Sequence, residues 1–392
     1  MFGITAIKKS MKEHSAIFSL VAVVLFFQIL LAATGNGTQI NPVNIASLIR
    51  QNAYVVILAI GMMICILTGG NIDLSVGSAM GMLSAMISIL MGQLDLNTPV
   101  SLLLILLCGV ALGVWNGFWI AVMRVPSFLV TLTGMFMWRG LSLILLRGAN
   151  ISQVPEHKVA FLSSYIAPAG ASAMAVCLVA GVLFCVIYIT VCLMERVQRR
   201  RLGSAFFMES NLSFVFRLAV ISLVTLWLCY TLGRTQGFSF VFLLMVAVVL
   251  VYSFYTQRTV PGRHIYAMGG NERAAKFSGI NTRRILFSAY ANMGLLTAVA
   301  AIISIGRFNS ASSADEPLIN TFGACFVGGV SAYGGVGTVS GVVAGAVFMM
   351  LFNNGMSIMG VPTNWQRVIQ GLVLLFVLAM DIVLKKRSGR QN

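Results

Sequence analysis

Long apolar stretches alternate with short polar ones along the whole chain. Each apolar block approaches the roughly 20 residues that a helix needs to cross a bilayer. The pattern predicts an all-α, polytopic transmembrane helical bundle of about 10–12 spans. The expected crossings lie at 16–34, 51–68, 77–92, 99–123, 127–147, 166–193, 213–232, 238–255, 286–306, 317–331, 336–355 and 366–385.

Two of these crossings are shorter than the others and are flanked by glycine-rich polar runs. They are residues 77–92 and 317–331, and the sequence leaves open whether they are full spans or partial, broken helices. Non-helical backbone at membrane depth is tolerated only where protein or a water-filled cavity surrounds it. The stretch Gly35 to Arg50, which is more polar, is expected to be an external connection between the first two crossings.

The basic residues gather in short segments between the apolar blocks. They lie around Lys8, from Arg196 to Arg201, from Arg258 to Arg284, and from Lys385 onward. Short loops rich in Lys and Arg stay cytoplasmic, so this distribution places both termini in the cytoplasm. The net charge of +16 therefore follows from membrane topology and does not indicate nucleic-acid binding.

Composition agrees with a membrane protein. Hydrophobic residues make up 58% of the 392 residues and charged residues only 9%, against about 25% charged in ordinary soluble domains. Membrane lipid is therefore an expected partner. We expect one transmembrane domain over residues 1–392.

Glycines recur every fourth residue in two of the predicted crossings, a spacing that places them on one helix face and lets backbones approach closely. The two sets are Gly109, Gly113, Gly117 and Gly337, Gly341, Gly345. Since the two crossings run in opposite directions, the repetition also suggests an inverted repeat, as many transporters contain.

A first glycine-rich break, Gly69 to Gly77, interrupts two apolar blocks with the polar residues Asn71, Asp73 and Ser75. A carboxylate at membrane depth costs about 2.5–3.5 kcal/mol, so such a residue seldom lacks a role. Asp73 is expected either to line a polar pathway or, the reading we favour, to cap the start of the next helix.

A second glycine-rich break, Gly328 to Gly337, is expected to form a tight buried reversal between two helices. A phosphate-binding P-loop needs a Gly-Lys-Ser/Thr sequence, which occurs nowhere in the chain. Bound ATP is therefore not expected here, and the sequence indicates no cofactor, catalytic constellation or metal site.

The longest internal polar segment, residues 256–285, is expected to be a cytoplasmic loop that contains a short helix. Asn271 is a plausible N-cap, and Gly279 is expected to end the helix.

Five ordered motifs resemble the ribose/xylose/multiple-monosaccharide branch of ABC-importer permeases, and most closely its xylose and multiple-sugar members. They are residues 69–78, 125–145, 262–281, 328–341 and 361–375. The resemblance implies a bacterial cytoplasmic (inner) membrane protein, a cytoplasmic ATP-binding subunit on a separate chain, a periplasmic or lipid-anchored sugar-binding protein, and a second permease copy in a homodimer. An extra helix pair at about 166–235 is similar to that of the longer members.

The candidate residues fall into two groups. Those expected along the translocation pathway are Asn71, Asp73, Ser75, Asn116, Ser331 and Tyr333. Those expected to couple the chain to the ATPase are Gly270, Asn271, Glu272, Ala274, Ala275, Gly279 and Ile280. The importer coupling pattern has Glu before the two alanines, whereas Arg273 stands there in this chain.

Other functions stay open from the residues alone. An ATP-independent secondary transporter or channel normally needs intramembrane charges, for which Asp73 is the main candidate. A membrane scaffold or receptor would leave the coupling helix without a purpose. Within the importer class, the cargo could also be a nucleoside or a furanose signal molecule.

Overall fold

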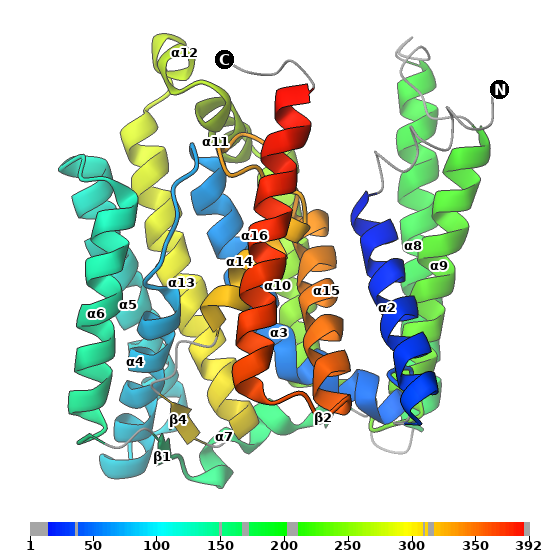
Figure 1. Ribbon diagram of the computed structural model, residues 1–392, viewed down its shortest axis with the longest axis horizontal. Helices are drawn as coiled ribbons and strands as arrows, with labels where there is room; N and C mark the ends of the chain where they lie inside the picture. The colour runs from blue at the N-terminus through cyan, green and yellow to red at the C-terminus, as the bar shows by residue number, and fades with distance from the viewer. Residues whose placement is uncertain are drawn as a thin grey trace.

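A computed structural model describes residues 15–35, 38–148, 151–166, 172–201, 211–308, 310–312 and 317–387, and Figure 1 shows a bundle of helices. The helices are α2 (Ser15–Thr34), α3 (Pro42–Leu67), α4 (Val76–Ser88), α5 (Thr98–Gly117), α6 (Ser127–Leu145), α7 (Glu156–Ser163), α8 (Ala173–Arg201), α9 (Asn211–Gly233), α10 (Phe240–Arg258), α11 (Val260–Gly270), α12 (Glu272–Phe277), α13 (Thr282–Phe308), α14 (Pro317–Val327), α15 (Val339–Ile358) and α16 (Thr363–Arg387). Two π-helical turns, Ile89–Gln93 and Phe118–Val122, extend α4 and α5.

Ten helices in the described residues are long and apolar enough to cross a membrane, which confirms the predicted polytopic bundle. Of the two crossings whose extent the sequence left open, 77–92 is long enough to span, because α4 and its π turn together form an 18-residue apolar helix. The other one is too short to span. Helix α14 has 11 residues, and at 1.5 Å per residue it covers only about half of a bilayer's hydrocarbon core.

Helix α3 forms the centre of the bundle. Every residue from Ala53 to Leu67 is buried, because α10, α13, α14 and α15 surround this helix. A helix that is apolar on all sides is suited to the core of a protein as well as to a lipid-facing span. The expected start at residue 51 is wrong: α3 begins at Pro42, where the Asn41 side chain accepts a hydrogen bond from the Val43 N–H (3.0 Å).

The glycine repeat of α5 packs against α13, as expected. A β-carbon at Gly113 would lie 2.3 Å from the Tyr290 carbonyl oxygen, and one at Gly294 would lie 2.1 Å from the Gly109 carbonyl oxygen. Since real β-carbons essentially never come within 3.0 Å of another heavy atom, only glycine permits this approach. The two backbones thus form a rigid pair.

The second glycine repeat is only partly a helix face. Gly341 and Gly345 lie on α15, where their β-carbons would lie 2.3 Å from the carbonyl oxygen of Gly328, just after α14, and 2.1 Å from that of Ala324 in α14. Gly337 precedes α15 and contacts Val330 instead, so its assignment to the helix face is wrong. A polar turn precedes Thr338, the N-cap residue, so α15 begins only at Val339.

The end of the bundle opposite α11 and α12 is closed by α7 and four short strands (Figure 1). Strand β1 (Ile151–Gln153) pairs antiparallel with β4 (Ser310–Ser312), and β2 (Tyr165–Ile166) with β3 (Phe238–Ser239). The predicted all-α fold contained no strands here, and the crossings expected from residues 166 and 238 begin within β2 and β3. Since an isolated two- or three-residue strand carries almost no pattern of its own, its pairing depends on the helices that position it.

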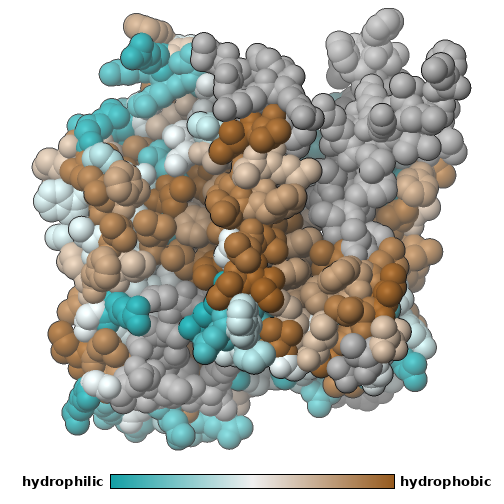
Figure 2. All heavy atoms as spheres, in the orientation of Figure 1, coloured by the Kyte–Doolittle hydropathy of each residue, from teal (hydrophilic) through white to brown (hydrophobic). Residues whose placement is uncertain are grey.

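The extra helix pair corresponds to α8 and α9, which stand at one edge of the molecule (Figure 1) and contact α3 through α9. Cys177, Cys229 and Leu232 form a small apolar cluster of this pair, which packs against Ile49 of α3 and Phe242 of α10. Over the rest of their length, both helices expose large apolar side chains. Hydrophobic residues dominate the middle of the face shown in Figure 2, and hydrophilic ones gather toward its two ends.

Lys158 of α7 ties the connection between α4 and α5 to the closed end. Its ammonium group donates hydrogen bonds to the carbonyl oxygens of Met91 and Leu96, each at 3.1 Å, and forms an ion pair with Asp95. The hydrogen bond and charge of Lys158 lower the pKa of the exposed Asp95 carboxyl. Asp95 is therefore ionised, and paired, at neutral pH.

Replacing Asp95 with asparagine is expected to loosen this connection at neutral pH but not in acid. A depressed pKa stabilises the fold above the ordinary value of about 3.9 and ceases to do so as the pH falls through the lowered value. Amide hydrogen exchange of residues 94–97 should be about two- to fivefold faster than in the unmodified chain at pH 7. That ratio should fall toward one below about pH 4, whereas a constant ratio would contradict the ion pair's role.

Candidate functional site

The first break comprises residues 68–75, between the end of α3 and the start of α4. Gly69 and Gly70 have φ angles of +113° and +79°, which side chains with a β-carbon rarely adopt. The chain then continues without helical hydrogen bonds until Val76. The glycine pair therefore ends α3 and turns the backbone back into the bundle.

Asp73 lies at the centre of a buried polar cluster in this break, with 4% of its surface exposed. Its Oδ1 accepts hydrogen bonds from the Ser75 backbone N–H (2.9 Å) and from the Ser75 hydroxyl (2.6 Å). Asn116 of α5 donates to the Ser75 hydroxyl oxygen at 3.1 Å. Asp73 thus accepts a backbone N–H just before α4, although Ser75 occupies the N-cap position itself.

Two neighbouring helices hold the backbone of the first break in place. The Tyr290 hydroxyl of α13 donates to the Ile72 carbonyl oxygen (3.3 Å), and the Thr131 hydroxyl of α6 lies 3.4 Å from the same oxygen. A carbonyl group in non-helical backbone needs such partners when it is buried. The break is therefore an ordered part of the bundle.

The second break comprises residues 328–338, between α14 and α15. Its tight reversal is closed by hydrogen bonds from the Ser331 N–H to the Val336 carbonyl oxygen (2.8 Å) and from the Gly334 N–H to the Ser331 carbonyl oxygen (3.0 Å). Ser331 is buried, whereas 66% of the Tyr333 surface is exposed. The structure therefore separates these two pathway candidates.

The two breaks touch each other through their backbones. The Gly335 N–H donates to the Leu67 carbonyl oxygen at 3.1 Å, and a β-carbon at Gly334 would lie 2.6 Å from the Gly69 Cα. A β-carbon at Gly70 would lie 2.5 Å from the Ala332 carbonyl oxygen. Glycine is therefore required on both sides of this contact, which links α3 and α4 to α14 and α15.

Helix α11 reaches this contact from the end of the bundle at which α12 lies. A β-carbon at Gly269 would lie 1.8 Å from the Leu67 carbonyl oxygen and 2.5 Å from the Gly335 nitrogen. The Tyr266 hydroxyl donates to the Gly337 carbonyl oxygen at 2.8 Å. We call the meeting of α11 with the two breaks the glycine junction.

The expected short helix of the 256–285 segment is present as α12, and α11 precedes it. The Asn271 side chain accepts from the Ala274 N–H (3.0 Å), which confirms the predicted cap, and Gly279 ends the helix with a φ of +81°. The two alanines face opposite ways, since Ala275 is buried and Ala274 is exposed. Phe277, the last helical residue, exposes 93% of its surface.

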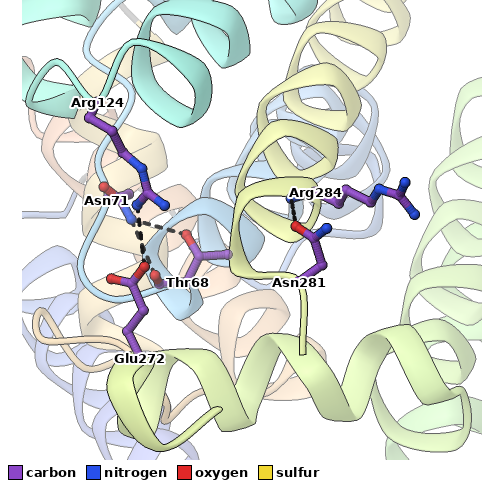
Figure 3. Close-up of polar contacts among 6 residues, drawn as sticks. All are labelled: Thr68, Asn71, Arg124, Glu272, Asn281 and Arg284. Atoms are coloured by element: carbon purple, nitrogen blue, oxygen red, sulfur yellow. Dashed lines mark hydrogen bonds and ion pairs between the residues drawn. The ribbon is translucent and has the colours of Figure 1, made fainter. Parts of the chain in front are cut away.

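The remaining coupling candidates lie at the start of α12 or directly beside it. Gly270 has no heavy atom near its missing side chain, Glu272 is the first helical residue, and Ile280 donates its backbone N–H to the Ala275 carbonyl oxygen (3.1 Å). Figure 3 shows Arg124, from the connection between α5 and α6, pointing toward Glu272, with which it pairs at 3.4 Å. Both side chains are about half exposed, so the pair adds little stability.

A polar cleft opens beside the glycine junction. Its volume is about 380 Å³, and its walls come from the first break, from residues 124–127 and from residues 268–272. Asn71 lines this cleft and donates to the Thr68 carbonyl oxygen and hydroxyl, each at 3.2 Å (Figure 3). Asn71 therefore lies on the accessible side of the break, and Asp73 lies on its buried side.

Sequence reasoning missed three parts of this arrangement: Gly269, Tyr266 and Arg124. Gly269 and Tyr266 lie within the motif 262–281, but nothing in that motif distinguishes the glycine that contacts the breaks from its neighbour Gly270. Arg124 has a φ of +62°, an unusual conformation for a residue with a side chain. Its position directly before Val125-Pro126 was the only signal that could have indicated a turn.

Comparison with known proteins agrees with this architecture. The chain is a polytopic transport permease, as its relatives and the ten helices of its described part that are long and apolar enough to cross a membrane indicate. It belongs to the family described as branched-chain amino acid transport system / permease component, whose model matches residues 44–378. The protein is therefore a multi-pass component of the inner membrane.

Three relatives in this family are similar to the chain over nearly its whole length. The xylose transport system permease protein of Escherichia coli (strain K12) is 34% identical over 374 residues, which cover 95% of this chain and 93% of the relative. Its counterpart from Haemophilus influenzae (strain ATCC 51907 / DSM 11121 / KW20 / Rd) is also 34% identical, over 96% of this chain and 98% of the relative. The ribose import permease protein of Escherichia coli (strain K12) is 27% identical, over 93% and 92%.

These relatives confirm the resemblance to monosaccharide-importer permeases that the five motifs indicated. The homology also implies a transporter rather than an enzyme. No solved structure matches the chain.

Proposed function

We propose that this chain is the permease subunit of an ATP-driven monosaccharide importer, with xylose or several sugars as its cargo. The homology to xylose and ribose permeases supports the cargo class. The observation that carries the mechanism is the glycine junction, where α11 contacts both non-helical breaks inside the bundle.

The proposed partners follow from the placement of the exposed surfaces. The cytoplasmic ATP-binding subunit docks on α12, whose Phe277 protrudes and whose Glu272 and Ala274 are exposed. With this basic end in the cytoplasm, both termini are cytoplasmic as well. The sugar-binding protein then meets the opposite end, closed by α7 and the strand pairs, and a second permease copy completes the complex.

The proposed mechanism transmits a movement of α11 and α12 to the pathway. When the ATPase subunit moves α12, α11 moves with it, because only Asn271 separates the two helices. Gly269 has no free space against Leu67 and Gly335, so the two breaks must follow. The first break carries Asp73 and Ser75, which therefore change position relative to Asn116 and open or close a polar route.

Reconstitution tests the proposed function against an ATP-independent transporter. We expect vesicles that contain the chain, its ATPase subunit and its sugar-binding protein to accumulate labelled xylose only when ATP is supplied on the α12 side. Vesicles that contain the chain alone should show no uptake above protein-free vesicles. Uptake by the chain alone would contradict the importer mechanism.

The cargo is tested in the same complex. We expect a pentose or hexose monosaccharide, added with the binding protein, to raise the rate of ATP hydrolysis. A nucleoside or a furanose signal molecule should leave this rate at its basal value. Stimulation by one of those compounds alone would assign the chain a different cargo.

A further inference from the structure

A groove of about 420 Å³ opens between the start of α13 and the π-helical turn that ends α5. It is lined by Val122, Asn281, Arg283, Arg284 and Phe287, none of which lines the polar cleft. Its volume is typical of a ligand site. The groove has an apolar wall, formed by Val122 and Phe287, and a basic one, formed by the two arginines.

This groove lies at the ends of two helices that are long and apolar enough to cross the membrane. The span of α5 and its π turn ends at Val122, and the span of α13 begins at Thr282. Trp119 belongs to the same π turn as Val122 and is exposed. Because tryptophan is enriched at the level of the lipid headgroups, the groove lies at headgroup depth, on the α12 side of the membrane.

The two arginines carry charge that the chain itself does not neutralise. Both are exposed, and neither pairs with an acid in the part of the chain that the structure describes. Glu272, the only acid in the 256–285 segment, pairs with Arg124. Figure 3 shows the Arg284 side chain extending away from that pair. The groove therefore suits a ligand that is negatively charged at one end and apolar at the other.

We propose that this groove binds an anionic phospholipid of the cytoplasmic leaflet, with its phosphate at Arg283 and Arg284 and its apolar part along Val122 and Phe287. Guanidinium groups match phosphate in shape and charge. A soluble anion would leave the apolar wall in water, whereas an uncharged lipid would leave the arginines without a partner. The assignment to the cytoplasmic leaflet rests on the orientation given with the proposed function, and basic segments attract the anionic lipids of that leaflet.

A lipid bound in this groove steadies the base of α12. Asn281 lines the groove, and the N–H of its neighbour Ile280 donates to the Ala275 carbonyl oxygen of α12 at 3.1 Å. The apolar wall is firm, because α5 packs closely on α13 there: a β-carbon at Gly117 would lie 3.1 Å from the Phe287 carbonyl oxygen. Anionic lipid should therefore favour the transmission of movement from α12.

The first test measures lipid binding by the full chain in phosphatidylcholine nanodiscs that carry a trace of photoactivatable phosphatidylglycerol. Mass spectrometry should find the label on the peptides that contain Val122 and Phe287. Arg283→Gln and Arg284→Gln should each lower this labelling about fivefold, the contribution of one basic residue near a membrane surface. Arg263→Gln removes the same charge from an exposed position of α11 outside the groove, and labelling should stay within about twofold. Equal labelling of all variants would overturn the proposal.

Two other occupants are tested in the same nanodiscs, and either would overturn the proposal. Loss of the label in the presence of excess glycerol phosphate would mean a site for a soluble anion. Weaker binding of the purified ATPase subunit to the double variant Arg283→Gln/Arg284→Gln, in nanodiscs of phosphatidylcholine alone, would mean that an acidic segment of that subunit fills the groove. We expect glycerol phosphate to leave the label in place and the double variant to bind the subunit as the unmodified chain does.

Uptake by the complete importer separates this proposal from the proposed function. Adding phosphatidylglycerol to phosphatidylcholine vesicles should raise ATP-driven uptake by the unmodified complex about fivefold, the low end of ordinary allosteric coupling. The double variant should show no such rise, and an equal rise in both complexes would overturn the proposal. Absence of ATP-driven uptake in either lipid mixture, with labelling of the groove intact, would instead overturn the proposed function.

Discussion

Replacement of Gly269 with alanine is expected to lower ATP-driven sugar uptake about 100-fold, the loss that a displacement of about 1 Å in a working site produces. The added β-carbon would lie 1.8 Å from the Leu67 carbonyl oxygen and 2.5 Å from the Gly335 nitrogen. Both neighbours are backbone atoms, so neither can rotate away. Helix α11 must move off both breaks, and the link from α12 to the pathway is lost.

A glycine outside the junction supplies the control for this prediction. No heavy atom lies within 4 Å of the position of a β-carbon at Gly371 of α16, so Gly371→Ala should retain uptake within about twofold. Uptake of labelled sugar into vesicles and binding of the ATPase subunit are measured for both variants. Similar uptake in the two variants would show that the glycine junction does not transmit movement.

The two breaks were visible in the sequence, but their contact was not. Paired glycines next to Asp73 and to Ser331 interrupt apolar blocks, and such interruptions are conspicuous in a chain this hydrophobic. The contact between Gly69 and Gly334 joins positions more than 260 residues apart, as the sequence numbering shows. No local pattern encodes such a pairing, because it follows from how α3, α14 and α15 pack.

The polar site in the bundle was predictable only in part. Asp73 and Ser75 stood out as polar residues in an apolar region, and Asn116 as an amide within a crossing. Trp138 did not, because a tryptophan in an apolar helix usually packs in the core or at the lipid interface. Its indole nitrogen lies beside Gly134 of α6 and near Asn116 of α5, a placement that only the packing of the two helices reveals.

The predicted helix boundaries were wrong where polar residues lie inside a helix. Asn44 and Arg50 suggested a connection before residue 51, yet both belong to α3. Asn44 and Asn354 exchange two amide hydrogen bonds (3.0 and 3.1 Å), and Asn52 donates to the Leu48 carbonyl oxygen. Helix packing thus satisfies side chains that a hydropathy pattern excludes from a crossing. The inverted repeat stays a prediction.

Replacement of Phe277 with aspartate is expected to weaken binding of the ATPase subunit at least about 30-fold, the effect of losing one aromatic hot spot. Phe277 exposes 93% of its surface at the end of α12, and Figure 1 shows this helix protruding from the bundle. Such an exposed aromatic side chain is costly in water, and a groove on a partner would bury it. Its neighbours Arg273 and Lys276 are exposed too and supply a basic rim.

The measurement is the Kd of the purified ATPase subunit for the full chain in lipid nanodiscs. Val260→Ser is the control, because Val260 is an exposed apolar residue at the start of α11, away from α12. The Kd of this variant should stay within about twofold of the unmodified chain.

Ala275→Trp should also lose docking and transport, but by displacing α12 from the bundle, since Ala275 is 4% exposed and faces the chain itself. Phe277→Asp keeps α12 in place and so tests the docking face alone. An unchanged Kd for Phe277→Asp would place the ATPase contact elsewhere on the chain.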